Sequence, residues 1–238
     1  AIADMDPEKA GDTAKLLRNK PELVDVENLI QISDLVVESA NASILGKVLK
    51  LSVKYKKNLL VMSVGGLLRH KNLLRLAAKA GVQIYVPSGA AAGLDAVRAG
   101  AVSGVKKAVL TTRKPPAGLK GAPYLIKNNI SLEKIKKAKT VFFGSVSEAV
   151  KGFPANINVS AALAFAAGGA EKVKVRIIAD PGVKTNTHEI EAEGKFGKIK
   201  AVTQNKPFPN NPKTSYLAAL SAVALIKRLA SKGLTAGS

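Results

Sequence analysis

Two side chains in the second half of the chain have the types and the spacing for chemistry on a small ligand. Asn186 and His188 fall in residues 184–193, which we predict to form a β-strand. Side chains alternate between the two faces of a strand, so this pair shares one face, about 7 Å apart. Histidine has an ordinary pKa close to neutrality and can exchange protons there. The pair therefore predicts a ligand site, and a buried, hydrogen-bonded histidine is the alternative from this strand alone.

A run of small residues forms a second candidate site. Pro87-Ser-Gly-Ala-Ala-Ala-Gly93 directly follows a predicted strand at residues 82–86. Small residues let the backbone come close to a ligand, and open α/β sheets bind ligands at the carboxyl ends of their strands. The turn is therefore a candidate cofactor contact, although turns of this kind also occur at positions that bind nothing.

Composition excludes several classes of function. The chain of 238 residues has no cysteine, which rules out a disulfide framework, a zinc-thiolate site and a cysteine nucleophile. That absence also suits a reducing cytoplasm, where we expect the protein to act. No stretch approaches the roughly 20 apolar residues of a membrane span, so we expect no membrane partner.

The net charge of +20 could indicate a nucleic-acid partner. The lysines, however, are spread over every segment, and the densest run, at residues 134–139, has no aromatic residue to stack on bases. We therefore expect a solvated basic surface, with nucleic acid as the less favoured interpretation.

Hydrophobic periodicity predicts an α/β protein. The first part alternates strands with helices, which is typical of a parallel sheet covered on both faces. We expect strands at residues 1–4, 35–39, 58–64 and 82–86, with helices at 7–19, 44–55 and 69–80. The second part predicts a mixed α/β domain, with a sheet backed by helices that forms a substrate or oligomerisation layer. Its expected strands are 105–113, 140–145, 173–179, 184–193 and 196–204, and its helices 131–137, 160–167 and 213–231.

Three features of that second part can be checked directly. The strands at 173–179 and 184–193 are predicted to pair around Pro181 and Gly182. The last helix is apolar nearly all round, so we expect it to be buried against the fold. The predicted domains are residues 1–103, 104–212 and 213–238.

Five segments together carry a family resemblance. They are Pro87-Ser-Gly-Ala90 with Gly93-Leu-Asp95, Phe153-Pro-Ala-Asn-Ile-Asn158-Val, Ala179-Asp-Pro, Asn186-Thr-His188 and Asn211-Pro-Lys-Thr-Ser215. In this order, over essentially the whole chain, they resemble the archaeal and bacterial NAD(P)-dependent L-aspartate dehydrogenases. The resemblance implies a Rossmann domain joined to a mixed α/β domain that holds the active site. It also implies NAD or NADP as cofactor, L-aspartate as substrate, a homodimer and a place in NAD biosynthesis.

The resemblance also assigns roles to residues. The family's catalytic histidine falls on His188, and its nicotinamide contacts fall on the turn Ser88, Gly89 and Ala90 and on Asn158. Asp4 matches the acid that ends the second Rossmann strand and accepts hydrogen bonds from the adenosine ribose.

The substrate's own chemistry adds further candidates. Asn186 is expected to orient the substrate. The two carboxylates of aspartate require donors, for which Lys213, Thr214 and Ser215 at the start of the last predicted helix are candidates. Ordinary helix capping is the alternative for those three residues.

The chain departs from the family pattern at its beginning. Family members start with a strand and a turn resembling G-x-G-x-x-G, which bind the cofactor diphosphate, and that unit does not precede Ala1. We expect either a fragment or a member that binds the cofactor weakly. The competing functions are another two-domain dehydrogenase such as a homoserine dehydrogenase, a basic nucleic-acid-binding module and an inactive fragment.

Overall fold

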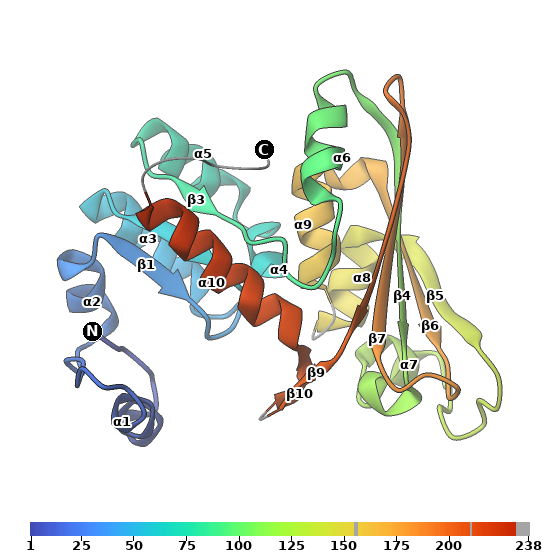
Figure 1. Ribbon diagram of the computed structural model, residues 1–238, viewed down its shortest axis with the longest axis horizontal. Coiled ribbons are helices and arrows are strands. Elements are labelled where there is room, and N and C mark those ends of the chain that lie inside the picture. Colours follow the sequence, from blue (N-terminus) through green and yellow to red (C-terminus); the bar gives the residue numbers. More distant parts are fainter. Residues whose placement is uncertain (155–156, 210, 232–238) are drawn as a thin grey trace. The chain divides into compact units, whose positions relative to one another are not determined.

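The computed structural model describes residues 1–154, 157–209 and 211–231, with the backbone alone for residues 211–213. The chain divides into two compact units, Ala1–Val86 and Pro87–Ser238. The division comes before the boundary expected after residue 103, because helix α6 (Leu94–Ala101) packs on elements of the second unit. Each unit is described separately below, and Figure 1 gives the element labels.

The first unit contains a parallel sheet with the strand order β1-β2-β3. Its strands are β1 (Leu35–Glu38), β2 (Asn58–Val61) and β3 (Ile84–Tyr85). Leu59, Leu60 and Val61 are fully buried, as a central parallel strand covered on both faces requires. The helices of the unit are α1 (Pro7–Lys15), α2 (Val26–Ile32), α3 (Leu45–Tyr55), α4 (Val64–Leu67) and α5 (Lys71–Lys79).

The expected first strand is reduced to one pair of residues. Ile2 forms an isolated parallel bridge with Leu23, and among the described residues this bridge is separate from the three-stranded sheet. The absence of a first βα unit stays a prediction.

Capping residues explain where two helices of this unit begin. Asp6 precedes the proline at the start of α1, and its carboxylate accepts from the backbone N–H groups of Glu8 and Lys9. Asp25 caps α2 in the same way, through Glu27 and Asn28. Sequence reasoning predicted α1, although four residues too long, and missed α2, whose start signal is of the same kind.

The second unit is built on a mixed five-stranded sheet with the order β5-β6-β4-β7-β8. Its strands are β4 (Val105–Lys114), β5 (Lys139–Ser145), β6 (Val173–Ala179), β7 (Asn186–Gly194) and β8 (Gly197–Asn205). β9 (Pro207–Phe208) and β10 (Asn211–Ser215) form a separate antiparallel pair. The helical elements are α6, η1 (Pro116–Leu119), α7 (Pro123–Lys127), α8 (Val146–Gly152), α9 (Asn158–Ala166), η3 (Ala170–Lys172) and α10 (Tyr216–Ala230).

One predicted strand pairing is wrong. β6 and β7 are not neighbours, because β4 lies between them, parallel to β6 and antiparallel to β7. The connection from Asp180 to Thr185 is long enough to pass the end of β4, since neighbouring strands are only about 4.8 Å apart. The predicted hairpin of β7 and β8 is confirmed, with Gly194 opposite Gly197.

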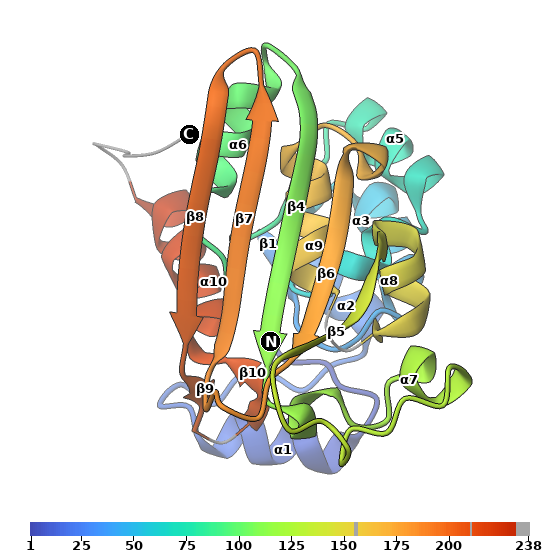
Figure 2. The ribbon, with the colours of Figure 1, turned by 90° about the vertical axis from the view of Figure 1, so that its right-hand side faces the viewer.

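Helices cover one face of this sheet and leave the other open. In Figure 2 the strands lie in front, and α6, α8 and α9 lie behind them. The covered face carries apolar residues such as Leu110, Ile177 and Ile190, each at most 2% exposed. α9 is rich in alanine, and its buried Ala161, Ala162 and Ala164 let the helix lie close to the sheet.

Two helix predictions in this unit fail. Residues 131–137 form no helix, and α7 begins earlier, at a proline that fits the first position of a helix. The last helix begins at Tyr216 rather than near residue 213, because the preceding residues pair with β9. It is also not buried all round: Leu217, Leu220 and Val223 are 39–48% exposed.

Candidate active site

A group of six polar residues lies on the helix-covered face of the second unit's sheet, at the carboxyl ends of β4 and β8 and the start of β7. Strand register brings them together: His188 is opposite Thr112 on β4 and Thr203 on β8, and Asn186 is opposite Asn205. Continuing the register of β4 and β7 by one pair brings Lys114 opposite Asn186. We call this group the polar row: Thr112, Lys114, Asn186, His188, Thr203 and Asn205.

His188 is the centre of the polar row. Its side chain is only 5% exposed, and its Nδ1 lies 2.9 Å from the hydroxyl oxygen of Thr112. Burial lowers the pKa of His188 to about 3, and the positive charge of Lys114 acts in the same direction. The ring is therefore held neutral near pH 7, rather than near its titration point as the sequence alone led us to expect. A neutral imidazole with one nitrogen engaged by Thr112 can accept a proton at the other.

Lys114 is the cation of the polar row, and sequence reasoning missed it. It is 6% exposed, and burial lowers its pKa to about 8 because an ammonium group loses hydration there. The signal that could have found it is the alternation along β4. Ala108 and Leu110 are apolar on the covered face, whereas Thr112 and Lys114 continue that face with polar groups.

The turn predicted to contact the cofactor is bound to the polar row. The carbonyl oxygen of Ala90 accepts from Thr203 Oγ1 at 2.7 Å and from Asn205 Nδ2 at 2.8 Å. The N–H of Gly89 donates to Ser221 Oγ on α10 at 3.0 Å. These side chains fix the path of the turn next to the strand that carries His188. Sequence reasoning singled out none of the three.

Glycine is required within this turn. Gly89 has φ 66°, a left-handed conformation that favours glycine, and a Cβ added there would meet no atom within 4 Å. The small residues therefore leave open space beside a backbone that is already held in place. The predicted contact of this turn with a nicotinamide cofactor stays a prediction.

Asn158, the other predicted nicotinamide contact, is exposed at the first position of α9. α9 lies against α6 and β6, which places this helix start within the same unit as the polar row. The other asparagine of the Asn-Ile-Asn motif, Asn156, lies outside the described residues. The predicted contact of Asn158 with a cofactor stays a prediction.

The three predicted carboxylate ligands lie at the end of β10. The side chain of Lys213 lies outside the described part of the chain, Thr214 is exposed and Ser215 is 7% exposed. Ser215 occupies the N-cap position of α10, but its side chain makes no capping hydrogen bond. Their contact with substrate stays a prediction.

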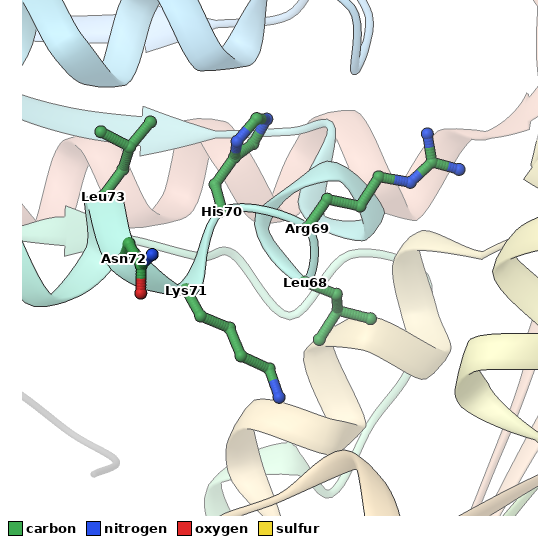
Figure 3. A pocket seen from close by; sticks show the side chains of 6 residues that line it. All are labelled: Leu68, Arg69, His70, Lys71, Asn72 and Leu73. Atoms are coloured by element: carbon green, nitrogen blue, oxygen red, sulfur yellow. The ribbon is translucent and has the colours of Figure 1, made fainter.

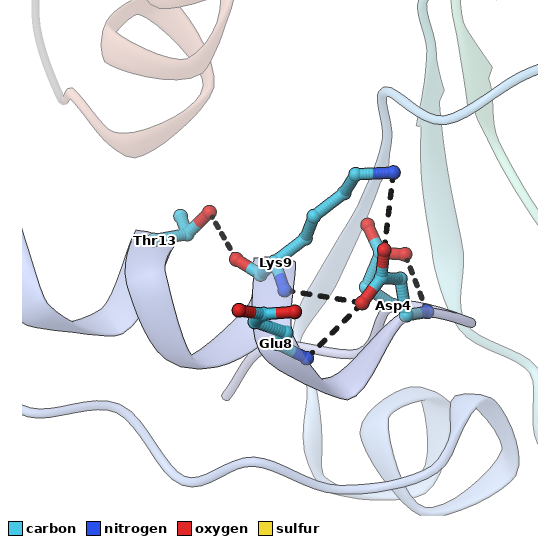
Figure 4. A network of polar contacts seen from close by, with 5 residues as sticks. Asp4, Glu8, Lys9 and Thr13 are labelled. Carbon is cyan, nitrogen blue, oxygen red and sulfur yellow. Dashed lines mark hydrogen bonds and ion pairs between the residues drawn. The ribbon is translucent and has the colours of Figure 1, made fainter.

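Asp4 lies in the first unit, just after the bridge of Ile2. It is exposed, and its carboxylate accepts from the N–H of Asp6 at 2.9 Å, beside the capped start of α1 (Figure 4). Its predicted contact with an adenosine ribose also stays a prediction.

Glu38, which closes β1, has a structural function in the first unit. It is 4% exposed and accepts from the N–H and the hydroxyl of Ser63 and from the N–H of Ala40. These bonds join the ends of β1 and β2.

A hollow of about 360 Å³ in the first unit does not have the properties of an active site. It is lined by the consecutive residues Leu68 to Leu73 between α4 and α5. In Figure 3 the side chains of Arg69, His70 and Lys71 point in different directions and do not converge on a common centre.

Among the described residues, no group of three or more His, Cys, Asp or Glu side chains could hold a metal ion. None of the described helices is both long and apolar enough to cross a bilayer.

Comparison with known proteins identifies two families in the chain. Residues 1–87 match the family "Homoserine dehydrogenase, NAD binding domain", and residues 95–229 match "Aspartate dehydrogenase, C-terminal". The L-aspartate dehydrogenase of Methanosarcina mazei is 44% identical over 233 residues, which cover 96% of this chain and 86% of that protein. The enzyme of the same name from Bradyrhizobium diazoefficiens is 40% identical over 96% of this chain and 81% of its own length.

Solved structures agree. The crystal structure of aspartate dehydrogenase from Thermotoga maritima covers 98% of this chain and 88% of its own, with a TM-score of 0.75 and 25% identity. A hyperthermophilic archaeal homoserine dehydrogenase in complex with NADPH is similar in fold alone, with a TM-score of 0.53 and 10% identity. The resemblance drawn from five sequence segments and the Rossmann-type fold class are therefore confirmed: the chain belongs to the aspartate dehydrogenase family.

Proposed function

We propose that this protein is an NAD(P)-dependent L-aspartate dehydrogenase, with His188 as the base that removes a proton from the substrate amine. The main observation behind this proposal is that a buried, neutral His188 lies in the polar row. Two other members of that row, Thr203 and Asn205, bind the Ala90 carbonyl of the predicted cofactor turn. Family membership supports the same reaction. The names of the relatives favour aspartate over homoserine.

The reaction oxidises L-aspartate to iminoaspartate. The nicotinamide supplies the redox chemistry by accepting a hydride from Cα. The residues of this chain have to hold the substrate, exclude water and take one proton. Ser88, Gly89 and Ala90 would position the nicotinamide side of the cofactor, together with Asn158. Asp4 would bind the ribose of the adenosine half.

Proton transfer is the task of His188. Its burial keeps the imidazole neutral, so the ring is ready to accept a proton from the substrate's ammonium or amine group. Thr112 holds the ring through Nδ1. The other ring nitrogen, Nε2, would then accept the proton. The proton taken from nitrogen and the hydride taken from Cα together leave the C=N bond of iminoaspartate. Water then hydrolyses this imine to oxaloacetate and ammonia, or the imine enters NAD biosynthesis.

An assay of substrate oxidation tests the proposal. The purified chain is mixed with NAD or NADP and either L-aspartate or L-homoserine, and the absorbance of reduced nicotinamide is followed. We expect reduction with L-aspartate, and a kcat/KM for L-homoserine lower by at least about a hundredfold. Such a difference is typical when buried charged groups of a site lose their partner. Faster oxidation of homoserine, or none of either substrate, would contradict the proposal. The same assay decides between NAD and NADP.

We also propose that the protein is a homodimer that acts in the cytoplasm. The open face of the five-stranded sheet, seen in Figure 2, combines exposed apolar residues such as Phe143 and Val202 with ion pairs between strands. A second copy covering this face would remove those apolar side chains from water. Light scattering should then give a mass of twice 24.8 kDa. Replacing Phe143 and Val202 by glutamate should reduce it to one chain, and a single-chain mass in the unchanged protein would refute the dimer.

A further inference from the structure

The carbonyl oxygen of Ala90 is fully used inside the chain. It accepts from Thr203 Oγ1 at 2.7 Å and from Asn205 Nδ2 at 2.8 Å. A carbonyl oxygen has two lone pairs, so these two donors satisfy it. Ala90 is 4% and Asn205 3% exposed, so the bond between them is shielded from water. The carbonyl group therefore serves to place the turn, and it is not left to accept from a ligand.

Thr203 joins this turn to the strand that carries His188. It lies directly opposite His188 in the pairing of β7 and β8. Its hydroxyl oxygen lies 3.4 Å from the carbonyl oxygen of His188, in addition to its shorter bond to Ala90. Threonine is branched at Cβ and has few side-chain conformations. One short, stiff side chain thus connects the backbone of His188 to the turn.

Asn205 and Ser221 hold the turn from two different elements. Asn205 is two residues beyond Thr203 and therefore shares its face of β8. Ser221 on α10 accepts from the N–H of Gly89 at 3.0 Å and donates to the carbonyl oxygen of Ala218 at 2.8 Å. Side chains from β8 and α10 thus hold the turn at successive residues.

The proposed reaction requires a fixed relation between this turn and His188. A hydride leaves Cα of the substrate and a proton leaves its nitrogen, and these two atoms are bonded to each other. The nicotinamide ring, expected on the turn, and the imidazole of His188 must therefore be correctly placed around a single bond. A misplacement of about 1 Å in such an arrangement can lower the rate by about a hundredfold.

We propose that Thr203 and Asn205 are positioning residues that place the nicotinamide ring relative to His188. They act through the carbonyl group of Ala90. This inference rests on the proposed function and adds to it the contacts that relate the hydride acceptor to the proton acceptor. Removing these donors should slow turnover more than it weakens binding, because the nicotinamide ring is only one end of the dinucleotide.

Thr203→Val is the first test, because valine has nearly the shape of threonine and lacks the hydroxyl donor. The kcat for L-aspartate should fall about tenfold, since one hydrogen bond is lost and the ring is less well placed. The KM values for L-aspartate and for the cofactor should stay within about threefold of the parent. Thr203→Ser restores the hydroxyl group and should return kcat to within about threefold of the parent.

Thr13 provides the matched control. Its hydroxyl group donates to the carbonyl oxygen of Lys9 at 2.8 Å, which is a bond of the same kind, on α1 in the first unit. Thr13→Val should leave kcat and both KM values unchanged. The melting temperature of each variant, measured alongside, records any loss of stability separately.

Fluorescence of the reduced cofactor tests the inference without turnover. Reduced nicotinamide emits more strongly when a protein holds its ring than it does in water. At saturating NADH or NADPH, Thr203→Val should lose most of the gain in emission that the parent gives, while the dissociation constant stays within about threefold. Thr203→Ser should keep the gain. Asn205→Leu, which keeps the size of the side chain and removes its donor, should behave as Thr203→Val does.

The outcomes separate this inference from the proposed function. If the parent does not oxidise L-aspartate, the proposed function fails, and the emission of the bound cofactor still decides the inference. Unchanged kcat and emission in Thr203→Val overturn it. A loss of kcat that Thr203→Ser shares also overturns it, because the hydroxyl group would then not be responsible.

Two further results would count against the inference. A raised cofactor dissociation constant with unchanged kcat overturns it, because Thr203 would then act in binding alone. A parent that binds neither NADH nor NADPH overturns both the inference and the proposed function. Should Thr203→Val not fold, Asn205→Leu carries the same comparison with the parent.

Discussion

The His188→Ala variant should oxidise L-aspartate with a kcat at least about a hundredfold below that of the parent, in line with the usual contribution of a general acid or base. The physical reason is that the fold both holds the His188 ring in position and keeps it unprotonated. His188 is held by Thr112 at one ring nitrogen, and its burial keeps the ring neutral near pH 7. Alanine removes the proton acceptor and leaves the rest of the polar row in place. Steady-state kinetics with saturating L-aspartate and cofactor measure the effect.

A matched control is available in the same chain. His70 is the other histidine of the 238 residues and lies in the first unit, at the start of α5. His70→Ala should keep kcat within about twofold of the parent, because its side chain takes no part in the proposed proton transfer. Near-normal turnover of His188→Ala, in a protein that melts at the parent's temperature, would remove His188 from the mechanism. A large loss of kcat in His70→Ala would indicate that a residue of the first unit contributes to turnover.

The Phe153→Ala variant should lose about 3–5 kcal/mol of the free energy of unfolding of the second unit, the usual range for deleting a buried aromatic ring. Phe153 is 1% exposed and packs with Tyr124 and Phe142, with ring centroids 5.5 and 5.3 Å away. This cluster joins α7, β5 and the segment that leads from α8 to α9. Its loss should therefore loosen the start of α9, where Asn158 lies. Denaturant unfolding, followed by circular dichroism, measures the change.

Ile126 provides the control for this prediction. It lies on α7, two residues after Tyr124, and is 68% exposed. Ile126→Ala should change the free energy of unfolding by less than about 1 kcal/mol, because an exposed side chain gives little hydrophobic stabilisation. Equal losses from the two variants would show that the aromatic cluster does not stabilise the unit. If Phe153→Ala is stable but binds NAD weakly, the segment would have a direct function in cofactor binding.

Several features of the fold and of the candidate site could be predicted from the sequence because their signals are local. His188 and Asn186 share a face by strand alternation, and β7 and β8 form the predicted hairpin around Gly194. Asp6 and Pro7 identified the start of α1 for the same reason, since a helix cap involves residues next to each other in the chain. The boundaries of β6 were also predicted correctly.

The errors share a different cause. The predicted pairing of β6 with β7 was wrong because β4 lies between them in the sheet. No local sequence pattern distinguishes a short hairpin from a connection that passes over one strand. The helix α10 was predicted to be buried on all sides, but several of its apolar residues are exposed. An apolar sequence shows which side chains a helix could bury, and it does not show which other elements cover them. The pKa of His188 was expected near neutrality, whereas burial and the charge of Lys114 lower it to about 3.

The sequence by itself determined the family, the alternation of strands and helices, and the histidine on which the proposed chemistry depends. Those features depend on residue types and on spacings within single segments. Only the tertiary structure brought Lys114 and Thr112 to that histidine, and Thr203, Asn205 and Ser221 to the turn at Gly89 and Ala90. The reason is that hydrogen bonding between strands sets which residues face each other across the sheet, and residues as far apart as Ala90 and Asn205 become neighbours only when the register is formed.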